Sequence, residues 1–526
     1  MNRKTFRLVF NKHLGALVPV AEFVSAQQKS PARGECSGQA SAPVGRAARR
    51  SALAARAGPC RLSECSAILR GHSWRHGLRA GFLGLALGAP VLAQTQALPE
   101  GGEVVRGEAS MSRSGQQMTI HQRSDKVGIN WQSYRIGEGN SVTYRQPSSS
   151  SVALNRVIGT DRSEIYGNLN ANGKVFLINP NGILFARSAQ VNVGGLLAST
   201  RDISDQDFMD GRYRFAGDSS EQIVNQGHLR SEGGSIVLSG QQVVNEGTIE
   251  TVGGRTTLAA GQAYTVQLDA AGRMSVQVTR STLNALVDHR GLIVADDGSV
   301  YLTAHGRQMA QTAAINVEGV VRARGIRRNG GTVILDGGTE ETGGVVEVSA
   351  GEIDVSSNAR RGGTVILSGQ YVGVRNGGRI DASGDAGGGR VILGGDKLNK
   401  ARDVFQTRFA DKAVLDSTSS IDIHSGGGDG GFLETSGRAV AISGSVNGRS
   451  AGRAGQWLID PDNLIISNST GAGGGNSIYT PGTGGSYVQD SALKNADITL
   501  DANAGANAGD IYSDSDVNVN LSLIHI

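Results

Sequence analysis

A short repeat is the feature that most restricts how this chain can fold. The segment IVNQGHLRSEGGSIVLSG (223–240) aligns with VVNEGTIETVGGRTTLAAG (243–261) at a period of 20 residues. Identical residues then coincide at four places: Asn225 with Asn245, Gly227 with Gly247, Gly234 with Gly254, and Leu238 with Leu258. Looser copies follow, and GGTVIL recurs at 330–335 and 362–367 before GGRVIL at 388–393. Short β-type runs with Gly and Asn corners, repeated at this length, predict a β-solenoid of stacked rungs.

The composition fits a stack with a thin core. Aromatic residues make up 5% of the chain, and Gly reaches 77 residues against 10 Pro. A globular enzyme core needs more bulk, whereas a disordered Gly-rich linker would lack the recurring Val, Ile and Leu triplets. Leucine-rich repeats are excluded because their LxxLxLxxN register is missing, and collagen because Gly does not fall at every third place. We therefore predict an all-β chain.

The first 93 residues differ from the rest in charge and in cysteine. They hold 14 Lys and Arg against 3 Glu, which leaves 37 basic and 44 acidic residues beyond them. The net charge of +4 for the whole chain is therefore no argument for nucleic-acid binding. All three cysteines, Cys36, Cys60 and Cys65, lie in this segment. The remainder is thiol-free, as suits a chain that crosses an oxidising compartment unfolded.

The same segment ends as a secretory signal peptide does. Residues 80–93, AGFLGLALGAPVLA, form an apolar run with arginines before it, too short to span a bilayer. The small residues at its end predict cleavage between Ala93 and Gln94. The opening MNRKTFRLVFNKHLGALVPVAE resembles the extended signal-peptide region of very large exported proteins of Gram-negative bacteria. Residues 30–70, rich in Arg, Ala and Ser, depart from that pattern as an atypical insert.

Beyond Gly101 the sequence alternates short β-type runs with Gly and Asn. Alternation predicts strands at Met118–Gln122, Lys126–Trp131 and Ser141–Tyr144. The sharpest element is KVFLINPNGILFA at 174–186, in which two β-rich runs flank an Asn-Pro-Asn-Gly sequence. Asn in the first place, Pro in the second and Gly in the fourth are the residues that a type I turn favours.

The stretch from 127 to 200 resembles the secretion domain of filamentous-haemagglutinin-like exoproteins of two-partner secretion. INW, IGxGNxV, QP, ALNRVxG, IxGxLxANG, NPNGI and VGGLxAST occur in the order of that family, and QPSSS with ALNRV resembles its high-molecular-weight adhesin branch. The motif residues of the family map onto Asn130, Trp131, Gln146, Pro147, Asn155, Arg156, Gly194 and Gly195, and its turn onto Asn179, Pro180, Asn181, Gly182 and Ile183.

The resemblance implies a right-handed parallel β-helix that begins near Gly101. After passage through the Sec translocon, the module would be recognised by an outer-membrane transporter with POTRA domains and a β-barrel. We accordingly assign residues 1–93 to an extended signal peptide with an insert, 94–345 to the secretion domain and 346–520 to the repeats of an adhesin rod. The expected function is adhesion or haemagglutination at, or released from, the surface of a Gram-negative bacterium, with a host receptor that the residues do not identify. The turn residues are expected to shape the fold rather than to contact the transporter.

No catalytic or metal-binding pattern emerges from the residues. HExxH, GxSxG and GxxxxGK[ST] are missing from the sequence, and the histidines lack metal-ligand spacing. The segment DISDQDFMDG (202–211) lacks the spacing of a calcium loop and is expected to be a solvated loop. We therefore expect no enzyme, no cofactor and no metal. Two alternatives stay open: a contact-dependent growth-inhibition toxin or cytolysin with the same secretion domain, and a β-helical enzyme acting on polysaccharides.

The C-terminal part supports three smaller expectations. Trp457 and the Asp460-Pro461-Asp462 turn of GQWLIDPDNLIIS are expected to seat a loop or to end a section of the rod. Asn468 lies in the sequon Asn-Ser-Thr. Residues 521–526, LSLIHI, differ from the Gly- and Asn-punctuated sequence before them and match a translated sequencing adapter, so we expect further rungs in the natural protein.

Overall fold

The computed structural model describes residues 6–11, 16–21, 97–307, 315–327, 329–338, 344–467, 486–501, 511–513 and 524–525. The chain divides into two compact units, Met1–Gly84 and Leu85–Ile526. In the first, β1 (Phe6–Asn11) pairs antiparallel with β2 (Ala16–Ala21). The predicted cleavage site at Ala93 and Gln94, the insert at 30–70 and the sequon at 468–470 lie outside the described residues.

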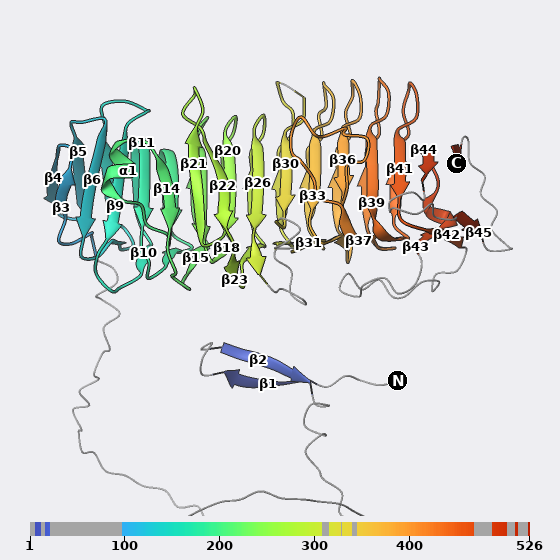
Figure 1. The fold of residues 1–526 in the computed structure, drawn as a ribbon. Helices are drawn as coiled ribbons and strands as arrows, with labels where there is room; N and C mark the ends of the chain where they lie inside the picture. The colour runs from blue at the N-terminus through green and yellow to red at the C-terminus, as the bar shows by residue number, and fades with distance from the viewer. Residues whose placement is uncertain are drawn as a thin grey trace, which may run out of the picture. The chain divides into compact units, whose positions relative to one another are not determined.

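The second unit is a parallel β-helix, as the repeats predicted (Figure 1). Each rung contributes strands to three parallel ladders. The first ladder contains β7 (Arg135–Ile136), β10 (Ser163–Ile165), β12 (Ile183–Phe185), β15 (Gln222–Asn225), β18 (Gln242–Asn245), β24 (Leu286–His289), β28 (Ile315–Val317), β31 (Val345–Ser349), β34 (Tyr371–Arg375), β37 (Ala410–Leu415), the end of β39 (Phe432–Ile442), β43 (Ser486–Gln489), β42 (Leu464–Ser467) and β45 (Ile511–Ser513).

The other two ladders share the long strands β11 (Asn168–Ile178) and β13 (Gln190–Ser199). The second ladder runs through β5 (Gln117–Gln122), β8 (Ser141–Arg145), the first halves of β11 and β13, β16 (His228–Arg230), β19 (Thr248–Glu250), β25 (Leu292–Val294), β29 (Val320–Arg322), β32 (Glu352–Asp354), β35 (Arg379–Asp381), β38 (Ser420–Asp422) and β40 (Ser445–Asn447). The third runs through β6 (Lys126–Trp131), β9 (Val152–Val157), the second halves of β11 and β13, β17 (Ser235–Gly240), β20 (Arg255–Ala260), β26 (Ser299–Ala304), β30 (Thr332–Asp336), β33 (Thr364–Ser368), β36 (Arg390–Leu393), the start of β39, β41 (Gln456–Asp460), β44 (Asp497–Leu500) and β46 (Ile524–His525).

The register of these ladders matches the sequence repeat. Asn225 lies beside Asn245, and Leu238 beside Leu258. The GGTVIL and GGRVIL segments also stack on one another, since Val333, Val365 and Val391 lie in one column. Inward-pointing Val, Ile and Leu of every rung form one continuous buried core. The alternation of the repeat therefore sets which side chains face inward.

The N-terminal end of the β-helix is closed by antiparallel strands. β3 (Glu103–Arg106) pairs antiparallel with β6, and β4 (Ala109–Ser114) pairs antiparallel with β5. These strands occupy hydrogen-bonding groups that the first parallel strands would otherwise expose at an edge. The β-helix thus starts close to Gly101, as the resemblance implied.

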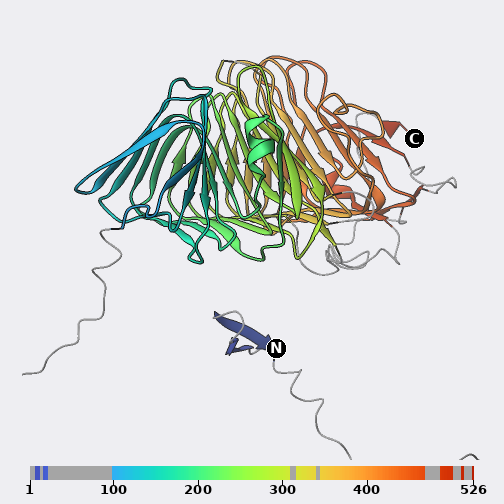
Figure 2. The ribbon, with the colours of Figure 1, turned by 60° about the vertical axis from the view of Figure 1, so that its left-hand side comes forward.

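Two segments outside the rungs cover apolar side chains on the outer face of the third ladder. Over the first rungs lie α1 (Asp205–Met209) and an antiparallel sheet of β14 (Tyr213–Ala216), β21 (Ala263–Leu268) and β22 (Met274–Arg280). Figure 2 shows α1 lying on this face. Two short strands pair parallel with each other nearby in the chain: β23 (Thr282–Leu283) directly follows β22, and β27 (Gly306–Arg307) follows β26. Over later rungs, residues 394–409 form what we call the strap, whose Ala401 is buried with Ile366 and Ile392.

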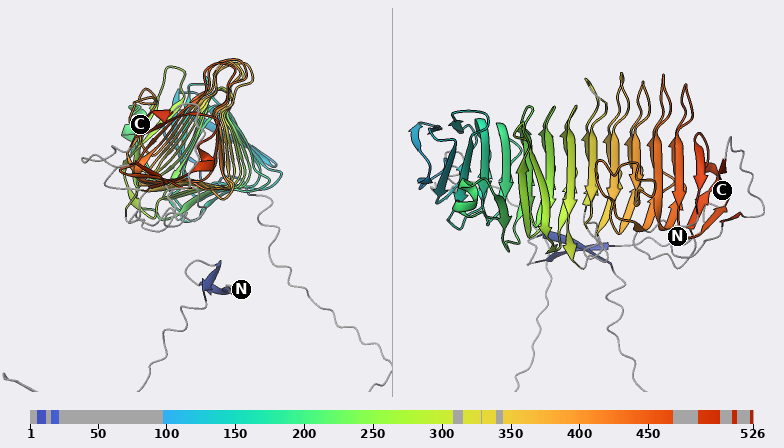
Figure 3. Two further views of the ribbon diagram at one scale, coloured as in Figure 1. Left: turned by 90° about the vertical axis from the view of Figure 1, so that its right-hand side faces the viewer. Right: turned by 45° about the horizontal axis from the view of Figure 1, so that its top comes forward.

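From residue 323 onward, long loops between the second and third ladders stack into a projecting ridge that we call the fin. Its loops are residues 323–331, 355–363, 382–389, 423–431 and 448–455. Isolated parallel bridges join them, as between Ser357 and Gly384 and between Ser425 and Ser450. Figure 3, left, looks along the β-helix and shows these loops superposed. In earlier rungs the same corner is a tight turn, such as residues 231–234.

The Asp-Pro-Asp turn does seat a loop, since Asp460 Oδ1 accepts from Lys397 Nζ of the strap over 2.9 Å, but the expectation that Trp457 ends a section of the rod was wrong. Its side chain is fully buried and lies in the core column between Leu433 and Ile498, with Nε1 donating to Thr435 Oγ1 over 3.2 Å. The ladder continues through β44 past the short 3-10 turn Asp490–Ala492, so this segment is an ordinary rung that does not end the stack. In the described part of the chain, no helix combines the length and hydrophobicity needed to cross a bilayer.

Candidate functional site in the first rungs

The Asn-Pro-Asn-Gly sequence forms the predicted turn. The amide of Gly182 donates to the carbonyl of Asn179 over 3.1 Å, and the amide of Asn181 donates to Asn179 Oδ1 over 2.9 Å. Gly182 has φ +98°, which L side chains rarely adopt. Asn179 is fully buried, whereas Pro180 is exposed. The turn leads directly into β12, where Ile183 is buried.

The same turn ties together the rungs on both sides of it. Asn179 Nδ2 donates to the carbonyl of Asp161 over 2.9 Å, and Asn181 Nδ2 donates to the carbonyl of Gly159 over 2.9 Å. On the other side, Ser219 Oγ donates to the carbonyl of Pro180. The side chains of both asparagines therefore satisfy backbone groups of the preceding rung, which is the fold-shaping role expected of them.

A buried aromatic and amide network lies inside the same rungs. Trp131 Nε1 and Tyr144 Oη both donate to Asn155 Oδ1, over 3.0 and 2.6 Å. Tyr134 Oη lies 2.9 Å from Tyr144 Oη, and the Trp131 and Tyr134 rings meet edge to face. Burial raises the pKa of both tyrosines, so they stay neutral. The network explains why Trp131 and Asn155 occur together: the amide supplies the acceptor that a buried indole and hydroxyl need.

Gln146 performs a similar task at the next corner. Its Nε2 donates to Gln122 Oε1 over 3.0 Å and to the carbonyl of Lys174 over 3.2 Å, while its Oε1 accepts from the amide of Gly173 over 2.9 Å. The side chain thereby joins three successive rungs. Pro147, the next residue, is exposed and starts the loop.

Arg156 anchors the segment that covers this face. Its guanidinium donates to Asp202 and Asp205 over 2.9 and 2.8 Å and to Asn130 Oδ1 over 3.3 Å. The expectation of a solvated loop at 202–211 was wrong, because Ser204 caps α1 here and Phe208 is fully buried. The two carboxylates hold this short helix against the β-helix. In the described residues, no group of three or more His, Cys, Asp or Glu side chains is placed to hold a metal ion.

Under this cover lies a second apolar cluster, separate from the core. Phe208, Tyr213 and Phe215 pack around Phe176, with ring centroids 6.4, 5.5 and 6.3 Å away. Lys126 Nζ donates to the carbonyls of Phe208 and Met209 at the end of α1. Sequence reasoning missed this layer. The signal was present in FMDGRYRF at 208–215, a concentration of aromatic residues in a chain otherwise poor in them.

The two glycines of VGGL permit close stacking of rungs. A Cβ atom on Gly194 would lie 2.8 Å from the carbonyl oxygen of Asn172, and one on Gly195 would lie 3.1 Å from Lys174 Cγ. The structure therefore places the predicted motif residues in neighbouring rungs, where most of them join one rung to the next. They form a structural unit with a covered outer face and no arrangement of nucleophile and base.

Comparisons with known proteins identify a secretion domain in the same part of the chain. Residues 95–355 match the family model of the TPS secretion domain, and residues 1–57 match that of the extended signal peptide of type V secretion systems. The crystal structure of the HMW1 secretion domain from Haemophilus influenzae superposes with a TM-score of 0.61 and 26% identity, over 79% of this chain and all of that chain.

Two curated relatives are named heme/hemopexin-binding protein, both from Haemophilus influenzae. One is 36% identical over 295 residues, covering 51% of this chain and 31% of the relative. The other is 32% identical over 252 residues, covering 46% of this chain and 28% of the relative. The chain thus spans less than a third of the length of the curated relatives it matches.

Proposed function

Because the chain is a two-partner secretion exoprotein, with a TPS secretion domain at residues 95–355, we propose that it is an extracellular binding protein of the adhesin type and not an enzyme. Its extended signal peptide and secretion domain make it a protein of a Gram-negative bacterium that is exported through the periplasm and is secreted or surface-exposed. We further propose that it crosses the inner membrane through the Sec translocon and that an outer-membrane transporter with POTRA domains recognises the first rungs.

One observation carries the proposal: the secretion module and the later repeats form one uninterrupted ladder. The third ladder passes from β6 in the module to β44 with parallel pairing at each step. A stack in which each rung contacts only its neighbours can fold as it emerges from a pore. The later rungs present a long regular surface with polar side chains, which suits binding.

The stacked acidic residues support a binding role over catalysis. Asp354 Oδ1 accepts from the amide and the hydroxyl of Ser356, over 2.9 and 2.6 Å, and Asp381 accepts from Ser383 in the same way. These carboxylates close turns at the base of the fin. A glycosidase would need a pair of carboxyl groups facing a sugar across an open site.

The names of the relatives favour a second candidate, capture of heme or of a heme-carrying protein. Hemin and hemopexin titrated separately into the secreted chain would decide between the two ligands.

Export is tested by producing the chain in a Gram-negative host with and without the transporter encoded beside its gene. We expect the chain in the medium or on the surface only when the transporter is present. A matched variant that lacks residues 97–131, and with them strands β3 to β6, should stay in the periplasm. Equal release in all three cases would contradict recognition of the module.

Adhesion is tested separately with exported protein, by binding to epithelial cells and extracellular matrix. Cell binding that saturates supports the adhesin. Cleavage of a polymer by the purified chain would contradict the proposal that it is not an enzyme.

A further inference from the structure

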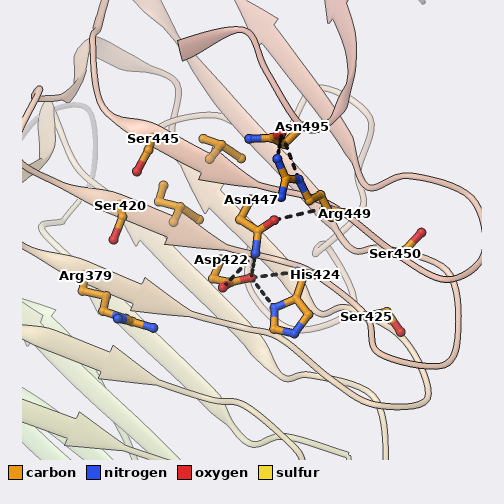
Figure 4. A pocket seen from close by; sticks show the side chains of 12 residues that line it. Arg379, Ser420, Asp422, His424, Ser425, Ser445, Asn447, Arg449, Ser450 and Asn495 are labelled. Carbon is orange, nitrogen blue, oxygen red and sulfur yellow. Dashed lines mark hydrogen bonds and ion pairs between the residues drawn. The ribbon is translucent and has the colours of Figure 1, made fainter. Parts of the chain in front are cut away.

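An open trough runs along the base of the fin, between the fin and the outer face of the second ladder. It has a volume of about 570 Å³ and is lined by residues of β35, β38 and β40, by two loops of the fin and by Asn495. All of its lining residues lie beyond residue 355, where the matched secretion domain ends. Figure 4 shows the lining side chains of this trough.

The floor of the trough consists of two columns of polar side chains in strict register. Arg379, Ser420 and Ser445 form one column, and Asp422 and Asn447 form the other, which continues to Asp381 beside the trough. The residue between them in each strand points into the core, as the burial of Ile380 and Ile421 shows. Polar groups therefore recur once per rung, about 4.8 Å apart. That spacing is close to the length of one sugar ring in an extended chain.

The wall of the trough adds further donors and acceptors. Asp422 Oδ1 accepts from the amide and from Nδ1 of His424, over 2.9 and 2.7 Å, and from Asn447 Nδ2 over 3.2 Å. Arg449 donates to Asn495 Oδ1 through Nε and a terminal nitrogen, over 3.0 and 2.8 Å. With its Nδ1 hydrogen bonded to Asp422, a neutral His424 has Nε2 as an acceptor. These amide, carboxylate, imidazole and guanidinium groups are held by one another in fixed positions before any ligand arrives.

The charges in and beside the trough balance. Two arginines, Arg379 and Arg449, are matched in number by two aspartates, Asp381 and Asp422, so neither a polyanion nor a polycation is favoured over its opposite. Among the residues that line the trough none is Trp, Tyr or Phe, so recognition would depend on hydrogen bonds. The ligand that fits this lining best carries many hydroxyl groups, because each hydroxyl can both donate and accept a hydrogen bond.

We propose that this trough binds an uncharged, hydroxyl-rich carbohydrate chain laid along the rungs. The fixed geometry of Asp422, Asn447 and Arg449 would orient the hydroxyl groups, and the fin would hold the chain against the second ladder. The proposal rests on the proposed extracellular binding role, since only an exported rod meets such polymers.

The test is calorimetric titration of the secreted chain with maltohexaose, cellohexaose and xylohexaose, and with an oligogalacturonate of equal length as the acidic comparison. We expect at least one neutral oligosaccharide to bind and the acidic one to bind more weakly. Ser445 is exposed, so the S445W variant should fold and should fill the trough, weakening binding at least about tenfold. The matched control is T248W, in the same column of a rung that has no fin.

Three outcomes would overturn the site: no binding of any neutral oligosaccharide, preferential binding of the acidic one, or S445W binding like the control. A chain that is exported and adheres to cells while failing this test would leave the proposed function standing. Circular dichroism of both variants separates loss of the site from loss of the fold.

Discussion

Asn245 Nδ2 donates to Nδ1 of His289 over 3.0 Å, and both side chains are fully buried at the corner after the first ladder. Asn225 donates in turn to Asn245 over 2.7 Å, and His289 Nε2 lies 3.0 Å from the carbonyl of Val320. His289 therefore occupies a place in a ladder of asparagines. To accept at Nδ1 and donate at Nε2, it must be neutral.

We predict that acid destabilises the chain through His289. Burial lowers its pKa from 6.5 to about 4. The unfolded chain takes up a proton as the pH falls through 6.5 and the folded chain does not, so stability is lost between pH 6.5 and 4, on the order of 3 kcal/mol. The H289N variant, which continues the asparagine ladder, should show a flatter pH profile in thermal unfolding. An unchanged profile would mean that His289 is not the group responsible.

We predict the opposite slope from Glu434. This carboxyl is fully buried, and burial raises its pKa to about 7 from 4.5. The folded state then binds the proton more tightly than the unfolded state, so stability falls as the pH rises from 4.5 to 7 and stays low above it, again on the order of 3 kcal/mol. E434Q keeps an oxygen to accept from the Lys397 amide and Ser436 Oγ, at 2.7 Å each in the wild type. It should raise the melting temperature at pH 8 and leave it unchanged at pH 4.

The Asn-Pro-Asn-Gly turn should tolerate no β-branched residue at its last two places. In G182V a side chain would have to adopt φ +98° with its Cβ 3.2 Å from the carbonyl oxygen of Gln222, a strain of about 1–3 kcal/mol. N181V would lose the hydrogen bond to Gly159. We expect both variants to be synthesised normally and to be secreted poorly, as measured by blotting of medium and cells. Gly233, with φ +68° and open space around it, gives the control G233N, and export of all three alike would show the turn to be dispensable.

The cover over the first rungs should depend on Phe208. Its ring is fully buried against Phe176 and Tyr213, so F208A should cost about 3–5 kcal/mol. The loss should appear as faster tryptic cleavage near Arg212, between α1 and β14. M209A, at a neighbouring position that is 36% exposed, should be cleaved at the wild-type rate. Equal cleavage of F208A would show that α1 is held mainly by the Arg156 ion pairs.

The mature chain should begin near Gln94 and contain no thiol. Mass spectrometry of exported protein gives its N-terminal peptide directly. A mature form that retains Cys36, Cys60 or Cys65 would place the cleavage elsewhere.

The ladder register was predictable because identical residues recur where rungs touch. Asn225 and Asn245 are 20 residues apart and lie side by side. The next partner, His289, is 44 residues on, because β21 and β22 leave the stack before the rung is completed. The repeat length does not reveal that β21 and β22 will leave the stack. Their departure has to be inferred from aromatic and apolar side chains on the outer face of the rungs that need a cover.

The two errors have local causes. DISDQDFMDG reads as polar because the helix it forms has five residues and buries only Phe208, too short for a helical period to show. Trp457 precedes an Asp-Pro-Asp turn, which suggested the end of a section, but its strand β41 pairs with β39 on one side and with β44 on the other. The positions of the motif residues, by contrast, followed from the resemblance, whereas their hydrogen-bond partners in adjacent rungs required the structure.

The fin has no interior of side chains: its two layers of main chain touch. A Cβ on Gly362 would lie 2.0 Å from the carbonyl oxygen of Ala382, and one on Gly388 would lie 2.1 Å from that of Ile423. Arg360 and Asp385, at the tips, are exposed. Substitutions in this ridge should therefore be tolerated at its crest, where charge and size can change, but not at the glycines beneath. The side chains that an antibody or a host surface would meet on the crest could therefore change in charge and size without any change in the backbone beneath them.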